Sequence, residues 1–122
     1  MNSYWILIGS ISCATCVLIG AFGAHGLKDI LNEYSRDIYE KATLYHFFHS
    51  IALIINGLLA KSFINLNFNC SGYLFIIGIV LFSFSLYVLA ITNIKILGAI
   101  TPLGGVCFIL GWLYIAIQIY NN

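Results

Sequence analysis

Charge is the scarcest property of this chain. Only 7% of its 122 residues are charged, compared with about 25% in ordinary soluble domains, whereas 61% are hydrophobic. So few ionic groups cannot keep so much apolar surface dissolved in water. The net charge is only +1, and the Lys and Arg residues do not form a basic stripe. The sequence therefore excludes nucleic-acid binding, which needs clustered cations to neutralise phosphates.

Proline and a disulfide framework are also missing. Pro102 is the one proline, and three of the four cysteines (Cys13, Cys16 and Cys107, but not Cys70) lie inside apolar runs. A thiol in such a run is usually a small packing residue. Cys13 and Cys16 have the spacing of a redox motif, but they lack the β-α-β context that gives this motif its chemistry. We expect no redox centre, no metal site and no bound cofactor.

The few charges are unevenly placed. Seven of the nine charged residues fall between Lys28 and Lys41, and Lys61 and Lys95 stand alone between apolar runs. A charged side chain at the centre of a membrane helix costs about 2.5–3.5 kcal/mol, so charge is confined to loops. The pattern predicts one all-α integral membrane domain over residues 1–122. We expect four transmembrane helices in a compact bundle, spanning residues 4–24, 39–60, 73–92 and 97–120.

The last span admits two interpretations. In the first, Thr101 caps a helix whose first residue is Pro102. In the second, one helix begins near Leu97 and is kinked or broken at Pro102, because the proline ring removes one backbone hydrogen bond. We favour the second interpretation.

The charged window predicts both a surface segment and an orientation. Apolar residues recur in it at three- and four-residue steps with charges between them. This predicts a short amphipathic cytoplasmic segment before the second span, with Ser35 as the N-cap of that span. The first and third loops carry four cations, and the second loop carries only Lys61. Since cytoplasmic loops are enriched in Lys and Arg, we expect the first and third loops inside and both termini outside the cytoplasm.

Small residues mark the faces through which the helices can meet. Lipid supplies no hydrophobic force between helices, so close packing at such faces must drive association. The partner of the ridge on the first span is either another helix of this chain or a second copy in a homo-oligomer. The ridge and a similar face on the last span comprise Ser12, Cys16, Gly20, Gly23, Ala24 and, in the last span, Gly105.

Polar side chains inside the spans are the candidates for function. His25, Tyr45, His49 and Thr101 come from three spans and are expected to cluster. An ionisable group in a span is by default a functional hypothesis. Three interpretations stay open: a proton relay or small-solute site, a haem or metal site, and a hydrogen-bonded structural core, which we favour. All four acidic residues lie in the first loop, so no catalytic residues are visible and we expect no enzyme.

Several motifs resemble the signature of a known family. The family consists of small four-helix membrane proteins of unknown function, and it includes bacterial inner-membrane proteins and transmembrane protein 256. The resemblance spans nearly the whole chain. It rests on residues 20–28 (GAFGAHGLK), 42–49, 81–87 (LFSFSLY) and 97–105 (LGAITPLGG), and on Gly111-Trp112.

Two positions depart from the family pattern. The family usually has Gln where this chain has His46 and Gly where it has Phe84. The first departure argues against His46 as a required ligand. The second suggests a slightly wider helix contact at Phe84.

The resemblance implies a multi-pass protein of a bacterial plasma membrane, the inner membrane, and it carries no established activity. We interpret the chain as a structural or accessory membrane protein, with membrane lipids as partners and a homo-oligomer as one option. The alternative is a small proton-linked transporter or channel component that uses the intramembrane histidines and tyrosine. A haem- or metal-binding protein is the least favoured interpretation.

Overall fold

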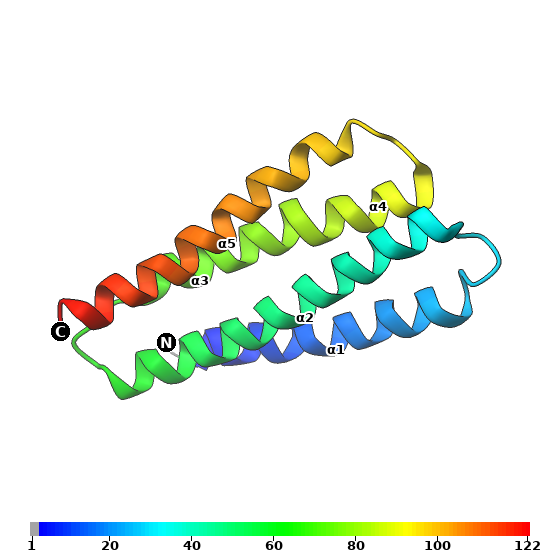
Figure 1. The fold of residues 1–122 in the computed structure, drawn as a ribbon. Coiled ribbons are helices and arrows are strands. Elements are labelled where there is room, and N and C mark those ends of the chain that lie inside the picture. Colours follow the sequence, from blue (N-terminus) through cyan, green and yellow to red (C-terminus); the bar gives the residue numbers. More distant parts are fainter. Residues whose placement is uncertain (1–2) are drawn as a thin grey trace.

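The computed structural model describes residues 3–122, which form long helices joined by short connections (Figure 1). Within this range four helices are long and apolar enough to cross a membrane, and no strand occurs. The predicted all-α membrane bundle is confirmed. In chain order the helices are α1 (Ser3–His25), α2 (Glu33–Ser62), α3 (Asn69–Gly78), the π-helical segment η1 (Ile79–Phe84), α4 (Ser85–Thr92) and α5 (Leu97–Tyr120).

The second helix begins earlier than the sequence predicts. The side-chain oxygen of Asn32 accepts a hydrogen bond from the Ser35 amide at 2.8 Å, so Asn32 is the N-cap and α2 starts at Glu33. Ser35, the expected cap, instead lies buried in the first turn. The amphipathic segment is therefore not separate from the span. Residues 26–30 are turns, and from Glu33 onward the charged residues belong to α2.

The third span is one rod made of α3, η1 and α4. It begins at Asn69 rather than Tyr73, and the Asn67 side chain accepts a hydrogen bond from the Asn69 amide at 2.9 Å in the turn that leads into it. A π-helical turn inserts one extra residue into a helix, and η1 places this insertion in the middle of the rod. The rod ends at Asn93, whose left-handed backbone (φ 57°) caps α4.

α5 runs without interruption from Leu97 through Pro102. Thr101 does not start a helix. Its hydroxyl donates to the Leu97 carbonyl oxygen at 3.2 Å, within α5, and it also lies 2.8 Å from the Ser85 hydroxyl of α4.

α2 is the central helix, and it packs against α1 on one side and against the α3–α4 rod on the other (Figure 1). α5 covers the outer face of the rod. One core cluster lies toward the α1–α2 connection and comprises Leu27, Leu31, Tyr39, Ala42, Leu86, Tyr87, Leu89 and Ala90. The second lies toward the termini and comprises Trp5, Ala52, Leu53, Phe75, Ile79 and Phe108.

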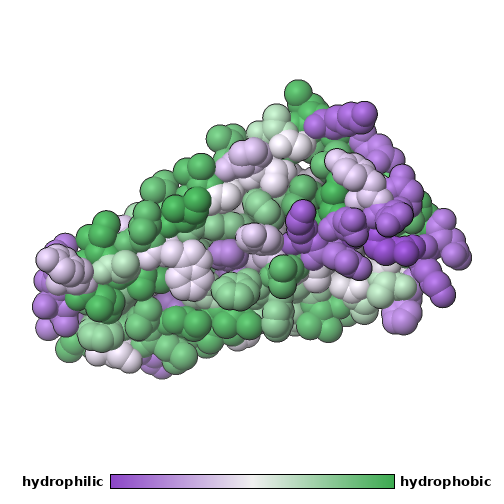
Figure 2. Space-filling model, viewed as in Figure 1, coloured by the Kyte–Doolittle hydropathy of each residue, from purple (hydrophilic) through white to green (hydrophobic). Residues whose placement is uncertain are grey.

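The outer surface of the bundle is apolar along its length and hydrophilic at its ends. Hydrophilic residues gather mainly at the end that carries the α1–α2 and α4–α5 connections, and both termini lie at the opposite end (Figures 1 and 2). Large side chains such as Val17, Leu18 and Ile109 are more than half exposed between the ends. In water such exposure would be costly, whereas hydrocarbon solvates these side chains.

Two glycines permit backbone-to-backbone contact between helices. A Cβ on Gly104 of α5 would lie 2.4 Å from the Phe82 amide nitrogen of η1, and a Cβ on Gly9 of α1 would lie 2.8 Å from the Ser50 carbonyl oxygen of α2. Real Cβ atoms do not approach other atoms so closely. The α5–η1 and α1–α2 crossings therefore require glycine at these two positions.

Neighbouring glycines of α5 offer a matched test of this crossing. Gly104→Ala should destabilise the bundle by about 1–3 kcal/mol, because the methyl group meets backbone that cannot move aside. Gly105→Ala should be tolerated, because its Cβ meets only the Phe82 ring, at 3.9 Å. The measurement is unfolding in mixed micelles with increasing sodium dodecyl sulfate, followed by circular dichroism. Equal stability of the two variants would contradict the assigned crossing.

Candidate functional site

Buried polar side chains of α2 connect it to every other helix of the bundle. His46, His49, Ser50 and Asn56 are each at most 5% exposed. Polar atoms inside hydrocarbon must find partners within the protein, because no water is there to serve them. The partners of these four side chains lie on α1, on the α3–α4 rod and on α5.

The His46 side chain joins three helices. Its Nδ1 lies 2.9 Å from the Tyr87 hydroxyl of α4, and its Nε2 lies 3.2 Å from the Ser12 hydroxyl of α1. The Ser12 hydroxyl lies 2.5 Å from that of Ser50, which donates to the backbone carbonyl of His46 at 2.7 Å.

The number of protons on each hydroxyl group assigns a donor and an acceptor to each of these hydrogen bonds. Ser50 has one hydroxyl proton, and it goes to the carbonyl, so Ser12 must donate to Ser50. Ser12 then has no proton left for His46, so the Nε2 of His46 must carry the proton and donate. The Nδ1 of a neutral ring accepts, so Tyr87 donates to it. The result is a one-way chain, from Tyr87 through His46, Ser12 and Ser50 to a backbone carbonyl.

The His49 ring is fixed by a second set of contacts. Its Nδ1 donates to the Tyr45 carbonyl oxygen at 2.9 Å, and its Nε2 accepts from the Trp112 indole at 3.0 Å. Because a carbonyl can only accept and an indole can only donate, this histidine is also neutral. Its ring stacks on Phe108 of α5 with 3.5 Å between ring centroids. His49 thus ties α2 to α5.

Asn56 and Trp5 organise the end of the bundle that carries the termini. The Asn56 amide donates to the Phe68 carbonyl at 2.9 Å and accepts from the Ser71 hydroxyl at 2.6 Å. The Trp5 indole of α1 donates to the Asn69 side chain of α3 at 2.9 Å. These bonds fix the α2–α3 connection against α1.

The structure brings together only part of the predicted cluster. Tyr45 and His49 lie one turn apart on α2, and His49 bonds to the Tyr45 backbone. His25 is exposed at the end of α1, and Thr101 pairs with Ser85 instead. His25 and Thr101 therefore do not join His49, because each sits nearer the loop-bearing end of its own helix.

Sequence reasoning missed the most buried histidine. The predicted cluster does not include His46, where the resembling family usually carries Gln, yet its ring is only 1% exposed and holds two cross-helix bonds. A Gln side chain also offers one acceptor and donors, so the departure itself was the signal of a hydrogen-bonding position.

The ridge of small residues on α1 faces α2 of the same chain. The Cys16 thiol donates to the Thr43 carbonyl at 3.4 Å, and a Cβ on Gly20 would lie 3.3 Å from the Thr43 methyl. A Cβ on Gly23 would overlap the Tyr39 ring. Ala24, at the end of the ridge, is exposed. The ridge of α1 therefore packs against α2 of the same chain, and homo-oligomerisation stays a prediction.

No trio of His, Cys, Asp or Glu within residues 3–122 is close enough to hold a metal ion. The four cysteines are free thiols. Both ring nitrogens of His46 and of His49 already hold hydrogen bonds, so coordination of a metal or haem would require one of these bonds to break.

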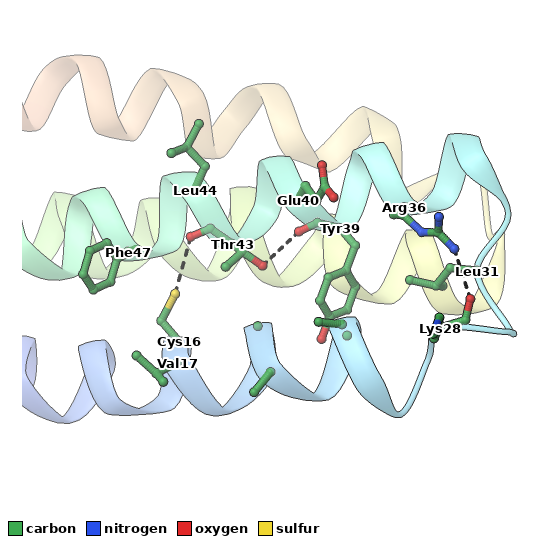
Figure 3. Close-up of a pocket in the computed structure, with 14 residues that line it drawn as sticks. Cys16, Val17, Lys28, Leu31, Arg36, Tyr39, Glu40, Thr43, Leu44 and Phe47 are labelled. Atoms are coloured by element: carbon green, nitrogen blue, oxygen red, sulfur yellow. Dashed lines mark hydrogen bonds between the residues drawn. The ribbon is translucent and has the colours of Figure 1, made fainter.

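Two hollows border these helices. The larger, of about 820 Å³, is a groove between α1 and α2 that reaches the loop joining them (Figure 3). The smaller, of about 300 Å³, lies beside the His49 ring and is lined by Leu44, Tyr45, Phe48, His49 and Trp112. The larger hollow has charged groups at one end, whereas the smaller has none.

The outer surface is apolar, four helices are long and apolar enough to span a membrane, and the buried histidines are neutral and hydrogen-bonded. These features define a multi-pass integral membrane protein. Comparison with known proteins identifies its family. The family model described as "Protein of unknown function (DUF423)" matches residues 19–105, and the chain belongs to this family. No solved structure is significantly similar to it.

Several related sequences are staphylococcal proteins that are named UPF0382 membrane proteins. One from Staphylococcus epidermidis is 48% identical over 113 residues, which cover 93% of this chain and 92% of the relative. One from Staphylococcus saprophyticus is 45% identical over 117 residues, covering 96% and 97%. One from Staphylococcus aureus is 42% identical over 117 residues, covering 96% and 95%. The resemblance to a family of small membrane proteins of unknown function is thereby confirmed, and the relatives' names agree with four helices that are apolar enough to span a membrane.

Substitutions at His46 test the hydrogen-bond chain. His46→Leu should destabilise the bundle by about 1–2 kcal/mol, because Tyr87 and Ser12 lose their partner, and His46→Gln should recover much of that loss. Tyr87→Phe should cost clearly less in the His46→Leu background than in the wild type. Unfolding in mixed micelles measures all four variants. Strict additivity of the His46→Leu and Tyr87→Phe effects would show that the two side chains are not coupled.

Proposed function

We propose that this chain is a structural or accessory membrane protein and that its intramembrane histidines serve packing rather than chemistry. One observation carries the proposal: the hydrogen bonds of His46 run one way and end on a backbone carbonyl. A proton relay needs a chain whose last member can release the proton, and a backbone carbonyl cannot. Both nitrogens of His49 are likewise occupied.

Within residues 3–122 the Ser12 hydroxyl lies on a histidine ring nitrogen, but it accepts from His46 Nε2 instead of donating to it, so His46 does not act as its base, and this supports a non-enzymatic role. All four acidic residues lie between Asp29 and Glu40, toward the end of the bundle that carries the α1–α2 connection, and within residues 3–122 none makes a hydrogen bond or ion pair with a histidine. General acid–base catalysis needs two such groups within reach of one substrate atom.

Transport is the second candidate, and the 300 Å³ hollow beside His49 favours it. This hollow is lined by the Tyr45 and Trp112 side chains and reaches the ring of the buried His49. Its weakness is that the His49 ring is clamped by Phe108 stacking on one side and by two hydrogen bonds at its edge.

Proton flux distinguishes the two functions. Purified protein is reconstituted into vesicles containing a pH-sensitive dye, and a potassium diffusion potential is applied from about pH 5 to 8, the range in which an unperturbed histidine titrates. We expect the flux of the wild type to equal that of protein-free vesicles, because no intramembrane histidine has a free nitrogen. His49→Phe should be equally inert. A flux that exceeds the blank, is lost in His49→Phe and persists in the exposed-site control His25→Ala would overturn the proposal.

We further propose that the α1–α2 and α4–α5 connections face the cytoplasm and that both termini face outward, in the plasma membrane of a bacterium. Lys28, Arg36, Lys41 and Lys95 lie at or beside these two connections, whereas Lys61 lies at the opposite end. Positive charge is retained on the cytoplasmic side during insertion, so the end with four cations is the inner one.

Thiol labelling tests this orientation. Cys70 is exposed at the start of α3, at the end that carries the termini. A membrane-impermeant maleimide should label Cys70 in intact cells, because that end faces outward. In a Cys70→Ser background, Lys95→Cys should be labelled only after the membrane is permeabilised. The reverse pattern would show that the bundle is inserted the other way.

A further inference from the structure

The groove between α1 and α2 is apolar inside and charged at one end. Its floor is made of small residues of α1, and its walls come from larger residues of α2 (Figure 3). Gly20, Ala21 and Ala24 leave space on α1, while Leu44 and Phe47, both more than 40% exposed, project from α2. The Tyr39 side chain bridges the two helices, and its hydroxyl donates to the Ile19 carbonyl at 2.5 Å.

The open end of the groove carries two cations. An Arg36 Nη atom donates to the Lys28 backbone carbonyl at 3.0 Å, which holds the guanidinium across the loop (Figure 3). This bond uses one of five guanidinium donors, and the Lys28 ammonium has no hydrogen-bond or ion-pair partner among residues 3–122. Glu40 lies on the same rim. Lys28, Arg36 and Glu40 together give the rim a net charge of +1. The guanidinium and the ammonium still have hydrogen-bond donors that are not in use.

The depth of the groove corresponds to one leaflet of a bilayer. From Arg36 to Phe47 the groove follows α2 over about eleven helical rises, which is about 16 Å at 1.5 Å per residue. The hydrocarbon core of a bilayer is about 30 Å thick, so one leaflet contributes about half of that. A volume of about 820 Å³ also lies within the range of ordinary ligand sites, about 300–1,000 Å³.

We propose that this groove binds one anionic phospholipid of the surrounding bilayer, a phosphatidylglycerol. Its phosphate pairs with Lys28 and Arg36, a headgroup hydroxyl donates to Glu40, and one acyl chain lies along the small residues of α1. A single negative charge matches the net charge of the rim. Arginine is suited to phosphate because its planar fork donates two parallel hydrogen bonds.

This assignment goes beyond the accessory function proposed above and is independent of it. It involves neither His46 nor His49, so an inert or an active protein in the flux experiment leaves it unchanged. The lipid experiment in turn says nothing about transport.

Native mass spectrometry of the full-length protein in a mild detergent tests the site. The probes are phosphatidylglycerol, phosphatidylethanolamine and phosphatidylcholine with identical acyl chains. We expect one phosphatidylglycerol to be retained in preference to the other two. Lys28→Gln and Arg36→Gln should each weaken its retention by roughly fivefold, the factor expected for the loss of one cation beside a lipid headgroup.

Matched controls separate the site from general lipid affinity. Lys61→Gln removes a cation at the opposite end and should leave retention unchanged. Ala21→Phe fills the groove and should abolish retention, whereas Leu18→Phe, an exposed residue of α1 outside the groove, should not. Circular dichroism of each variant establishes that the bundle is folded.

Three results would overturn the proposal. Equal retention of all three lipids would mean that the headgroup is not recognised and that only annular lipid is bound. Preference for phosphatidylethanolamine would assign the rim to a zwitterionic lipid instead. Unchanged retention in folded Ala21→Phe would place the lipid elsewhere on the surface.

Discussion

The bundle depends on the fact that hydrocarbon offers no hydrogen-bond partners. Polar side chains buried in the membrane must therefore find partners in the protein itself, and most of those in residues 3–122 belong to α2; the Ser83 hydroxyl is the buried one that has no partner. This explains why α2 is central. His46 reaches α1 and α4, His49 reaches α5, and Asn56 reaches the start of α3. Each bond gives a neighbouring helix a preferred rotation and height, which apolar contact alone would leave undetermined.

Close packing at glycine complements these bonds. At Gly9 and Gly104 the backbones of two helices touch, while at Gly72 and Gly111 an aromatic ring from another helix fills the gap. Both kinds of contact gain dispersion energy only at short range, so they require the helices to be aligned already. The polar bonds supply the alignment and the glycines allow the helices to come close. The interior thereby becomes dense, although α1 and α5 have most of their surfaces turned toward lipid.

Charge and hydropathy were sufficient to predict the four spans, because the cost of burying a charge in hydrocarbon exceeds every local preference. The helix ends were less predictable. Asn32, and not Ser35, is the N-cap of α2. Which residue caps the helix depends on how the α1–α2 connection folds back. Hydropathy placed Tyr45 and His49 inside the second span. It could not show that His25 and Thr101 lie away from His49, because the relative height and rotation of different helices follow from contacts between them. The π-helical segment left no trace in the sequence, since a single extra residue in a uniformly apolar run changes neither length nor hydropathy noticeably.

That single extra residue changes the direction in which side chains point along the third span. Successive residues of an α-helix turn by about 100°, so the insertion within Ile79–Phe84 offsets the angular register of the residues after it from that of the residues before it. In the first half of the rod, Phe75 and Gly78 contact α5. In the second half, Ser85 contacts α5 and Tyr87 contacts α2. In a homologue lacking the insertion, the same side chains would point elsewhere. Alignments of such sequences should therefore carry a one-residue gap here, inside a membrane helix, where gaps are conventionally forbidden.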